Sequence, residues 1–324
     1  MATSSDKGIR YSSFNRYLQQ WFGCRVHKIT IHAGFTCPNR DGKVARGGCT
    51  FCNNAGFSPN LRVGAAEVRE QIVQGMQSRG RKASQFIAYF QAYTNTYGPL
   101  EHLKALYDEV WTFPEVVGLS IGTRPDCVDE RVIDLIAGYT KHGEVWIEYG
   151  LQSSLDRTLE AVNRGHTYQQ FLDAVELSRD RGLKICVHTI LGLPGEDREM
   201  MLETHRRLAR LPIDGIKIHL LHIMRDTAMA MQYTMGQITL LSQEEYANLV
   251  VDVLELLPPN VVIQRMHADA PRDVLVAPDW CLDKSGVLDD IRRIQRARNS
   301  WQGKALGFTL ADLPYAVTDR PARV

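Results

Sequence analysis

Residues 25–52 read RVHKITIHAGFTCPNRDGKVARGGCTFC and join a strand pattern to a loop that contains three cysteines. Cys37, Cys49 and Cys52 lie in one glycine-rich, otherwise hydrophilic segment that follows the β-branched run. Three thiolates brought close together suit a soft metal centre. Three ligands are also one fewer than a closed tetrahedral site needs, which indicates a fourth position kept for an exchangeable ligand.

Outward from this stretch, strand-like and helix-like patterns alternate through the first two thirds of the chain. We expect strands at six short β-branched or aromatic runs: residues 25–32, 85–93, 116–123, 144–150, 184–191 and 215–221. Amphipathic helical patterns fill the gaps, at residues 68–76, 103–110, 131–139, 168–181 and 197–208. A βα unit repeated about six times requires a parallel sheet with right-handed crossovers.

The expected strands are apolar on one face and polar on the other. In the sixth strand, Lys217 and His219 alternate with Ile216 and Ile218. A strand covered by helices on both faces would instead read as a continuous apolar run. Polar residues toward the carboxyl ends are typical of a barrel lumen lined for chemistry. We therefore predict an α/β fold, a partial (β/α)6 TIM-like barrel with a C-terminal α/β extension.

The pattern changes after residue 235. Ser242 and Glu245 form a capping box ahead of an amphipathic helix, and residues 261–265 and 283–298 read as a further strand and helix. We expect three parts in the chain: an N-terminal segment (1–25), the partial barrel (26–235) and a C-terminal extension packed on the barrel (236–324).

Composition excludes several classes of protein. The chain has 324 residues, of which 38 are basic and 37 acidic, so its net charge gives no global argument for nucleic-acid or membrane binding. It has no transmembrane-length apolar run, and its first 25 residues lack the apolar run of a signal peptide. Seven cysteines, scattered outside the loop, argue against a disulfide framework and predict a reducing, cytoplasmic setting.

The loop alone leaves two kinds of metal centre open. One is a Cys3His zinc knuckle with His27 or His32 as the fourth ligand, because Cys-x2-Cys pairs are common at zinc. The chain would then be a zinc-binding, nucleic-acid-binding module without catalysis. The position of the loop favours a reactive centre instead, because it follows the first strand of a βα array, at the mouth where such folds keep active sites.

Further segments carry a resemblance to a known family. Cys-x11-Cys-x2-Cys after the first strand, with an aromatic residue inside the last pair, is similar to the radical S-adenosylmethionine (SAM) superfamily, although the first spacing is wider than its commonest one. Segments that resemble the branch with oxygen-independent coproporphyrinogen dehydrogenases and elongator-type catalytic subunits are IGTRPD (121–126), YGLQS (149–153), AVNRGH (161–166) and HTILGLPGE (188–196). Segments that resemble the YhcC-type radical proteins are RYSSF (10–14), AGFTCPNRDG (33–42), DAPR (269–272) and WQGK (301–304).

The resemblance implies two cofactors and a set of contacts. A [4Fe–4S] cluster would be held by Cys37, Cys49 and Cys52, and SAM would chelate the open iron. Reductive cleavage of SAM would give a 5′-deoxyadenosyl radical that abstracts hydrogen from a substrate. The residues implied as SAM contacts are Gln91, Ala92 and Tyr93 for the methionine part, Gln152, Arg164 and His188 for the nucleoside, and Leu191 and Leu193 for the adenine.

Candidates for chemistry on the substrate are Cys127, expected at the barrel mouth, and Glu148 and His219, expected within or just beyond the barrel strands on the lumen face. Cys127 is either a thiol near the substrate or a buried packing residue. Several polar side chains on one lumen face indicate a polar substrate. The superfamily resemblance implies an electron donor such as flavodoxin or ferredoxin. The substrate is left open between an RNA and a small metabolite, and no membrane is expected.

Overall fold

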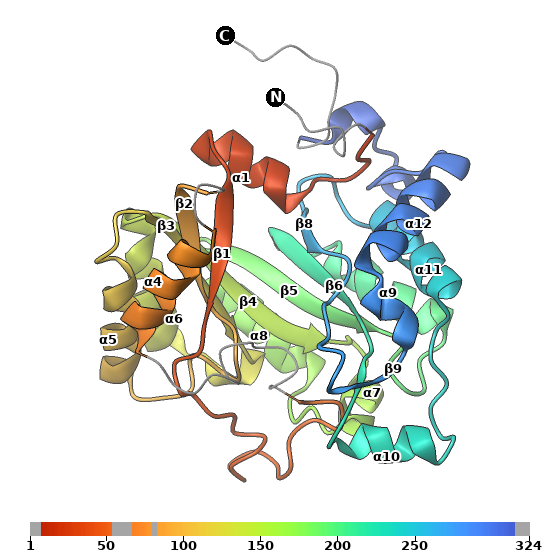
Figure 1. Ribbon diagram of the computed structural model, residues 1–324, viewed down its shortest axis with the longest axis horizontal. Helices are drawn as coiled ribbons and strands as arrows, with labels where there is room; N and C mark the ends of the chain where they lie inside the picture. The colour runs from red at the N-terminus through yellow and green to blue at the C-terminus, as the bar shows by residue number, and fades with distance from the viewer. Residues whose placement is uncertain (1–7, 54–66, 80–82, 315–324) are drawn as a thin grey trace.

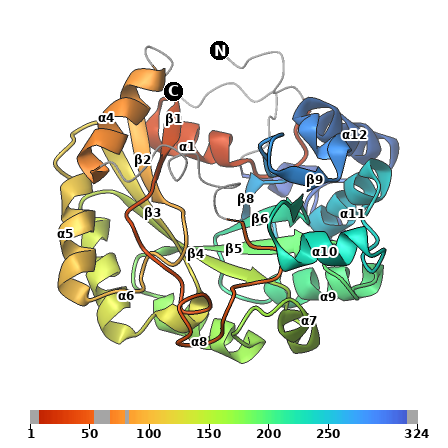
Figure 2. The ribbon, with the colours of Figure 1, turned by 60° about the horizontal axis from the view of Figure 1, so that its bottom comes forward.

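The fold is built on one seven-stranded parallel sheet in a computed structural model that describes residues 8–53, 67–79 and 83–314. The strands follow the order β1-β2-β3-β4-β5-β6-β8 and curve into a half-barrel (Figure 2). Their bounds are β1 Val26–Ile31, β2 Gln85–Phe90, β3 Val116–Thr123, β4 Glu144–Gln152, β5 Lys184–Leu191, β6 Gly215–Leu220 and β8 Val262–Arg265. The six predicted strands are all present, and the α/β partial-barrel class is confirmed.

Helices cover the outer face of the sheet (Figure 2). Those around the outside are α4 (Val68–Arg79), α5 (Leu100–Val110), α6 (Glu130–Ala137), α8 (Tyr168–Ser178), α9 (Arg198–Leu208) and α11 (Gln243–Leu256). The shorter α7 (Asp156–Ala161) and α10 (Ala228–Thr234) lie near the carboxyl ends of the strands, and α12 (Lys284–Ala297) packs on α11 (Figure 1). The main apolar core lies between the sheet and these helices, where outward-facing strand residues meet the helices.

The expected strand at residues 261–265 forms β8, which pairs with β6 and so adds a seventh strand to the same sheet. The C-terminal region therefore completes the half-barrel wall. It also supplies β9 (Leu275–Ala277), which pairs antiparallel with the short β7 (Ile223–Met224). The capping box at Ser242 is present, with Ser242 and Glu245 bonding each other's backbone amides at the start of α11. The division of the chain at residues 25 and 235 stays a prediction.

The N-terminal segment contains a helix, α1 (Phe14–Phe22), that lies across the amino ends of the strands (Figure 1). The Tyr17 hydroxyl donates to the Glu144 carboxylate, and Tyr17 and Phe14 stack edge-on against the buried Trp146. Apolar inward-facing residues at this level, among them Val26, pack with α1 into a separate cluster. This helix therefore forms the floor of the lumen.

Among the described residues, the structure contains no helix long and apolar enough to cross a membrane.

Candidate active site

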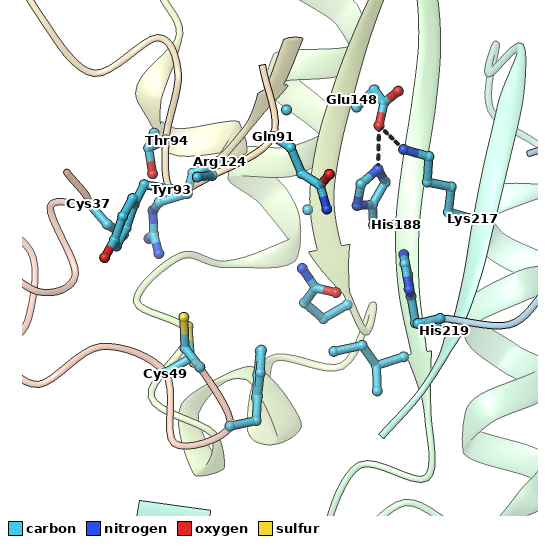
Figure 3. Close-up of a pocket in the computed structure, with 18 of the residues that line it drawn as sticks. Cys37, Cys49, Gln91, Tyr93, Thr94, Arg124, Glu148, His188, Lys217 and His219 are labelled. Carbon is cyan, nitrogen blue, oxygen red and sulfur yellow. Dashed lines mark hydrogen bonds and ion pairs between the residues drawn. The ribbon is translucent and has the colours of Figure 1, made fainter. Parts of the chain in front are cut away.

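The carboxyl ends of the strands and the cysteine loop enclose one cavity, with a volume of about 220 Å³. A buried water needs only about 10–15 Å³, so this space can hold a larger ligand. Figure 3 shows Cys49 on one side of the cavity and Glu148, His188 and Lys217 on the other. Parallel strands present their carboxyl ends at one edge, which explains why residues far apart in the chain meet here.

The cysteine loop follows β1 and is fixed by backbone hydrogen bonds to other elements. The Thr50 amide donates to the Val162 carbonyl at 3.0 Å, and the Met229 amide donates to the Thr50 carbonyl at 2.9 Å. The Asn163 side-chain amide donates to the Gly48 carbonyl at 2.7 Å. Residues after α7 and at the start of α10 therefore hold the loop over the cavity. Cys37, Cys49 and Cys52 are all free thiols that line it.

Two polar side chains donate to the sulfur of Cys49. Asn39 Nδ2 and Arg164 Nη1 each lie 3.5 Å from Cys49 Sγ. Burial, and then the nearby Cys49 and Cys37, raise the pKa of Cys52 to about 12. Three thiols on one loop, with two hydrogen-bond donors on Cys49, fit a site for a cationic metal centre, because metal binding removes the thiol protons and the donors stabilise the resulting charge.

Arg164 is held in place by a second arginine. Its Nη2 donates to the Gly150 carbonyl at 2.5 Å, and its own carbonyl accepts from Arg124 Nη1 at 2.7 Å. Arg124, 2% exposed, forms a two-bond ion pair with Asp126 at 2.9 and 2.8 Å. The 121–126 segment therefore has a structural task that the sequence alone does not disclose, which is to orient the donor to Cys49.

Two of the predicted SAM contacts have an unusual backbone. Tyr93 after β2 has φ 63° and Gln152 at the end of β4 has φ 77°, the left-handed region that L-residues rarely adopt. Such conformations cost roughly 1–3 kcal/mol and are found most often at functional sites. Both residues line the cavity, as do the predicted Gln91 and Ala92. Strand ends bent in this way turn their backbone amides and side chains toward the cavity.

A buried carboxylate organises the deep side of the cavity. Glu148 on β4 is fully buried and accepts hydrogen bonds from Lys28 Nζ at 2.6 Å and His188 Nε2 at 2.8 Å. It also accepts from Lys217 Nζ and from the Ser120 hydroxyl. These residues come from β1, β3, β5 and β6, so one carboxylate links strands across the lumen.

The charges of this network depend on one another. Burial alone would raise the pKa of Glu148, but the Lys217 and Lys28 ammonium groups, with the His188 hydrogen bond, hold it well below its usual value. Burial and the charge of Lys28 lower the pKa of Lys217 to about 7, although Glu148 opposes that shift. Burial and Lys217 lower the pKa of His188 to about 4. At neutral pH Glu148 is therefore ionised, His188 is neutral, and Lys217 can exchange a proton.

The structure places most of the predicted site residues around this cavity. Those that line it are Cys37, Cys49, Cys52, Gln91, Ala92, Tyr93, Glu148, Gln152, Arg164, His188 and His219. Leu191 and Leu193 do not line it. Because side chains alternate along a strand, Leu191 on β5 faces the helices while its neighbour Ile190 faces the lumen. Leu193 is buried in a small apolar cluster with Leu221.

Cys127 is outside the lining as well. Its thiol lies 4.0 Å from the Asp126 carboxylate, and its carbonyl accepts from the Thr96 hydroxyl at 2.6 Å. Burial and the Asp126 charge raise its pKa to about 12, so the thiol is not activated as a nucleophile.

Sequence reasoning did not identify the contributions of Asn39, Arg124 and Arg265 to the site. Asn39 lies inside the cysteine loop, where an amide among glycines reads as a turn residue. Arg265 is at the end of β8, and only the pairing of β8 with β6 brings it to the lumen. The available signal was the register of the last strand, which continues the polar face of the sheet.

Donor geometry separates the possible metal centres. Among residues 8–53, 67–79 and 83–314, the one group of three or more His, Cys, Asp or Glu donors within 4.8 Å of one another is Glu148, Cys186 and His188. In that group the Glu148 carboxylate is already paired with the ammonium groups of Lys28 and Lys217, so it is not free to bind a metal cation. The three loop sulfurs are thus spread more widely, whereas sulfurs around one tetrahedral zinc lie about 3.8 Å apart for a Zn–S bond of about 2.3 Å. Of the two histidines considered for zinc, His27 is near Arg79 of α4, and the His32 ring lies 6.2 Å from that of Tyr93.

Comparison with known families agrees with this architecture. The model of the radical SAM superfamily matches residues 37–208, and that of the radical SAM C-terminal domain matches residues 213–296. The chain belongs to the radical SAM superfamily. It is 41% identical to the uncharacterised protein YtqA of Bacillus subtilis over 298 residues, which cover 91% of this chain and 92% of YtqA. It is 40% identical to the protein YhcC of Escherichia coli over 296 residues, 91% of this chain and 94% of YhcC, and the YhcC-type resemblance is confirmed.

More distant similarities concern part of the chain or the fold alone. The tRNA uridine(34) acetyltransferase of Methanocaldococcus jannaschii is 29% identical over 163 residues, 49% of this chain and 30% of that protein. The solved structure of Elp3 from Methanocaldococcus infernus superimposes with a TM-score of 0.65 at 20% identity, covering 86% of this chain and 64% of that chain. This superposition confirms the fold.

Proposed function

We propose that the chain is a radical SAM enzyme in which Cys37, Cys49 and Cys52 hold a [4Fe–4S] cluster. When bound, the cluster would pass one electron to SAM and release a 5′-deoxyadenosyl radical for hydrogen abstraction. The observation that carries the proposal is the convergence of three free thiols on a cavity whose far wall is polar, in a chain of this superfamily.

The protein groups around the thiols support this proposal. Asn39 and Arg164 donate to the Cys49 sulfur, and such donors stabilise a cluster and tune its reduction potential. Tyr93 and Gln152 turn the ends of β2 and β4 toward the same space, where the methionine and nucleoside parts of SAM would lie. The lumen below is closed by α1, so the reaction takes place away from bulk water.

Anaerobic purification and a single variant test the proposal. We expect about four irons and four sulfides per chain, and formation of 5′-deoxyadenosine from SAM after reduction with dithionite. Cys49→Ser should lose both, whereas Cys24→Ser, which changes a cysteine outside the loop that bonds Gln85, should retain both. A colourless protein with one zinc would reject the cluster and favour the zinc-binding module.

An RNA substrate is a second candidate, because one relative is a tRNA-modifying enzyme by name. The chain would then need a surface for RNA beside the cavity as well as an electron donor such as flavodoxin or ferredoxin. SAM cleavage measured with and without total transfer RNA distinguishes the substrate classes. Faster turnover together with a modified nucleoside in the recovered RNA supports RNA, and unchanged turnover with unmodified RNA argues for a small metabolite.

A further inference from the structure

Three cavity side chains have polar atoms without protein partners among the described residues. His222 is 4% exposed, and neither of its ring nitrogens has a hydrogen bond. His219 Nε2 is likewise buried and unpaired. The half-buried Arg265 lines the same cavity, and its side chain forms no hydrogen bond or ion pair with the described part of the chain. Each unpaired buried polar group costs about 1–3 kcal/mol, so the two neighbouring histidines indicate a missing ligand.

These three side chains lie close together on the β6–β8 side of the cavity. Burial holds the pKa of His219 well below its usual value, and the nearby Arg265 and His222 act in the same direction. Figure 3 shows His219 beside the His188 and Lys217 side chains, across the cavity from the cysteine loop. A group bound there would therefore lie opposite the cluster site.

The charge balance at this side of the cavity is positive. Glu148 is already matched by two ammonium groups, and Asp269 at the rim is paired with Lys284 at 2.9 Å. Arg265 acts on the Asp269 charge and helps to lower the pKa of that carboxyl, but it forms no ion pair of its own with a described residue, so its guanidinium stays available to a ligand. A guanidinium presents parallel N–H donors that fit a carboxylate or a phosphate in two-bond geometry.

We infer that Arg265, His219 and His222 form a binding site for an oxyanion group, a carboxylate or a phosphate, carried by the substrate. The guanidinium supplies the charge, and each neutral imidazole supplies one N–H donor. The inference rests on the proposed function in that the bound molecule is the substrate of the radical reaction. The rest of that molecule would extend from β6 and β8 toward the cysteine loop, where hydrogen abstraction would occur.

The carboxylate of SAM is the competing occupant. The superfamily resemblance puts that carboxylate at the cluster, on the opposite side of the cavity from His219. Binding must therefore be measured with SAM already present. If SAM itself occupied the site, it would exclude a second anion.

The experiment is anaerobic isothermal titration calorimetry of the cluster-loaded protein saturated with SAM. Inorganic phosphate and succinate are titrated separately, so that the experiment distinguishes a site for phosphate from a site for a carboxylate. We expect saturable binding of at least one probe. Arg265→Gln should weaken it about tenfold or more, because the lost hydrogen bonds involve charged groups. Arg272→Gln is the matched control, since Arg272 is exposed and lies outside the cavity.

A second variant separates ligand binding from folding. His222→Phe replaces a buried ring with unpaired nitrogens by an apolar ring, so the thermal midpoint should not fall while probe binding is lost. Two results would overturn the inference: no saturable binding of either probe to the wild-type protein, or binding to Arg265→Gln as tight as to Arg272→Gln. Probe binding in a protein that fails to cleave SAM would support the anion site and reject the proposed function. SAM cleavage without probe binding would support the proposed function and reject the anion site.

Discussion

Replacing Glu148 with glutamine tests the charge network that crosses the lumen. The carboxylate is fully buried, and its partner Lys217 is 5% exposed, so the variant leaves a buried ammonium without its counterion. Breaking a buried ion pair from one side costs about 3–5 kcal/mol. Lys28 is 18% exposed and also bonds Gln264 at 2.8 Å, so it reaches other partners and adds less.

The cost should depend on pH in a definite direction. The pKa of Lys217 is already about 7, and loss of the carboxylate lowers it further. At pH 9 the Lys217 amine is then neutral in both proteins, and the variant loses hydrogen bonds, each worth about 1 kcal/mol, together with the partly exposed ion pair to Lys28. At pH 6 the wild type holds the ammonium in its ion pair, and the variant must keep it unpaired or release the proton. We therefore expect the full 3–5 kcal/mol at pH 6 and a clearly smaller loss at pH 9.

Anaerobic urea unfolding at the two pH values measures this difference. Glu203→Gln is the matched control, because that carboxylate is 40% exposed and its pair with Arg207 should contribute less than about 1 kcal/mol. The double variant Glu148→Gln/Lys217→Met removes both charges and should recover much of the loss. The reasoning is refuted if Glu148→Gln and Glu203→Gln lose the same free energy of unfolding at both pH values.

Two further predictions concern other parts of the chain. Gly165 has φ +73°, and a Cβ there would lie 2.4 Å from Asn39 Oδ1, so Gly165→Ala should cost more than about 1–2 kcal/mol of stability and lower the iron content. Gly195→Ala is the control, because Gly195 has φ +80° with open space around it and the substitution there has only the backbone cost. Equal losses of iron in the two variants would contradict this explanation. His205 is buried, bonds Thr189, and has its pKa lowered from 6.5 to about 4, so the folded chain binds fewer protons than the unfolded chain between those values. Stability should thus fall by up to about 3 kcal/mol as the pH drops from 6.5 to 4, and His205→Gln should remove this contribution in urea titrations across that range. An identical pH slope in the two proteins would refute it.

The strands and helices of the barrel could be predicted from the sequence because their periods are local. Alternation in β6 placed Lys217 and His219 on the lumen face, and both line the cavity. The same rule, applied to β5, would have assigned Leu191 to the helix face and Ile190 to the cavity. The choice of Leu191 came from a motif, and a motif does not state which way a side chain points.

The rest of the site could not be predicted because it depends on long-range pairing. Glu148 meets Lys28 across 120 residues of chain, and Arg265 reaches the lumen only through the register of β8 on β6. The hydrogen bond from Arg164 to the Cys49 sulfur likewise joins residues that are 115 positions apart in the chain. No local period specifies such contacts.

The order of the strands also has a consequence for synthesis of the protein on the ribosome. The cysteine loop ends at Cys52, but the wall that completes its cavity needs β8, which ends at Arg265. At about 5–20 residues per second, roughly 10–40 s pass between translation of these two points. During that interval the thiols belong to a nascent chain whose cavity wall is unfinished. Either the metal is delivered after the last strand has been translated, or the cysteine loop is protected until then.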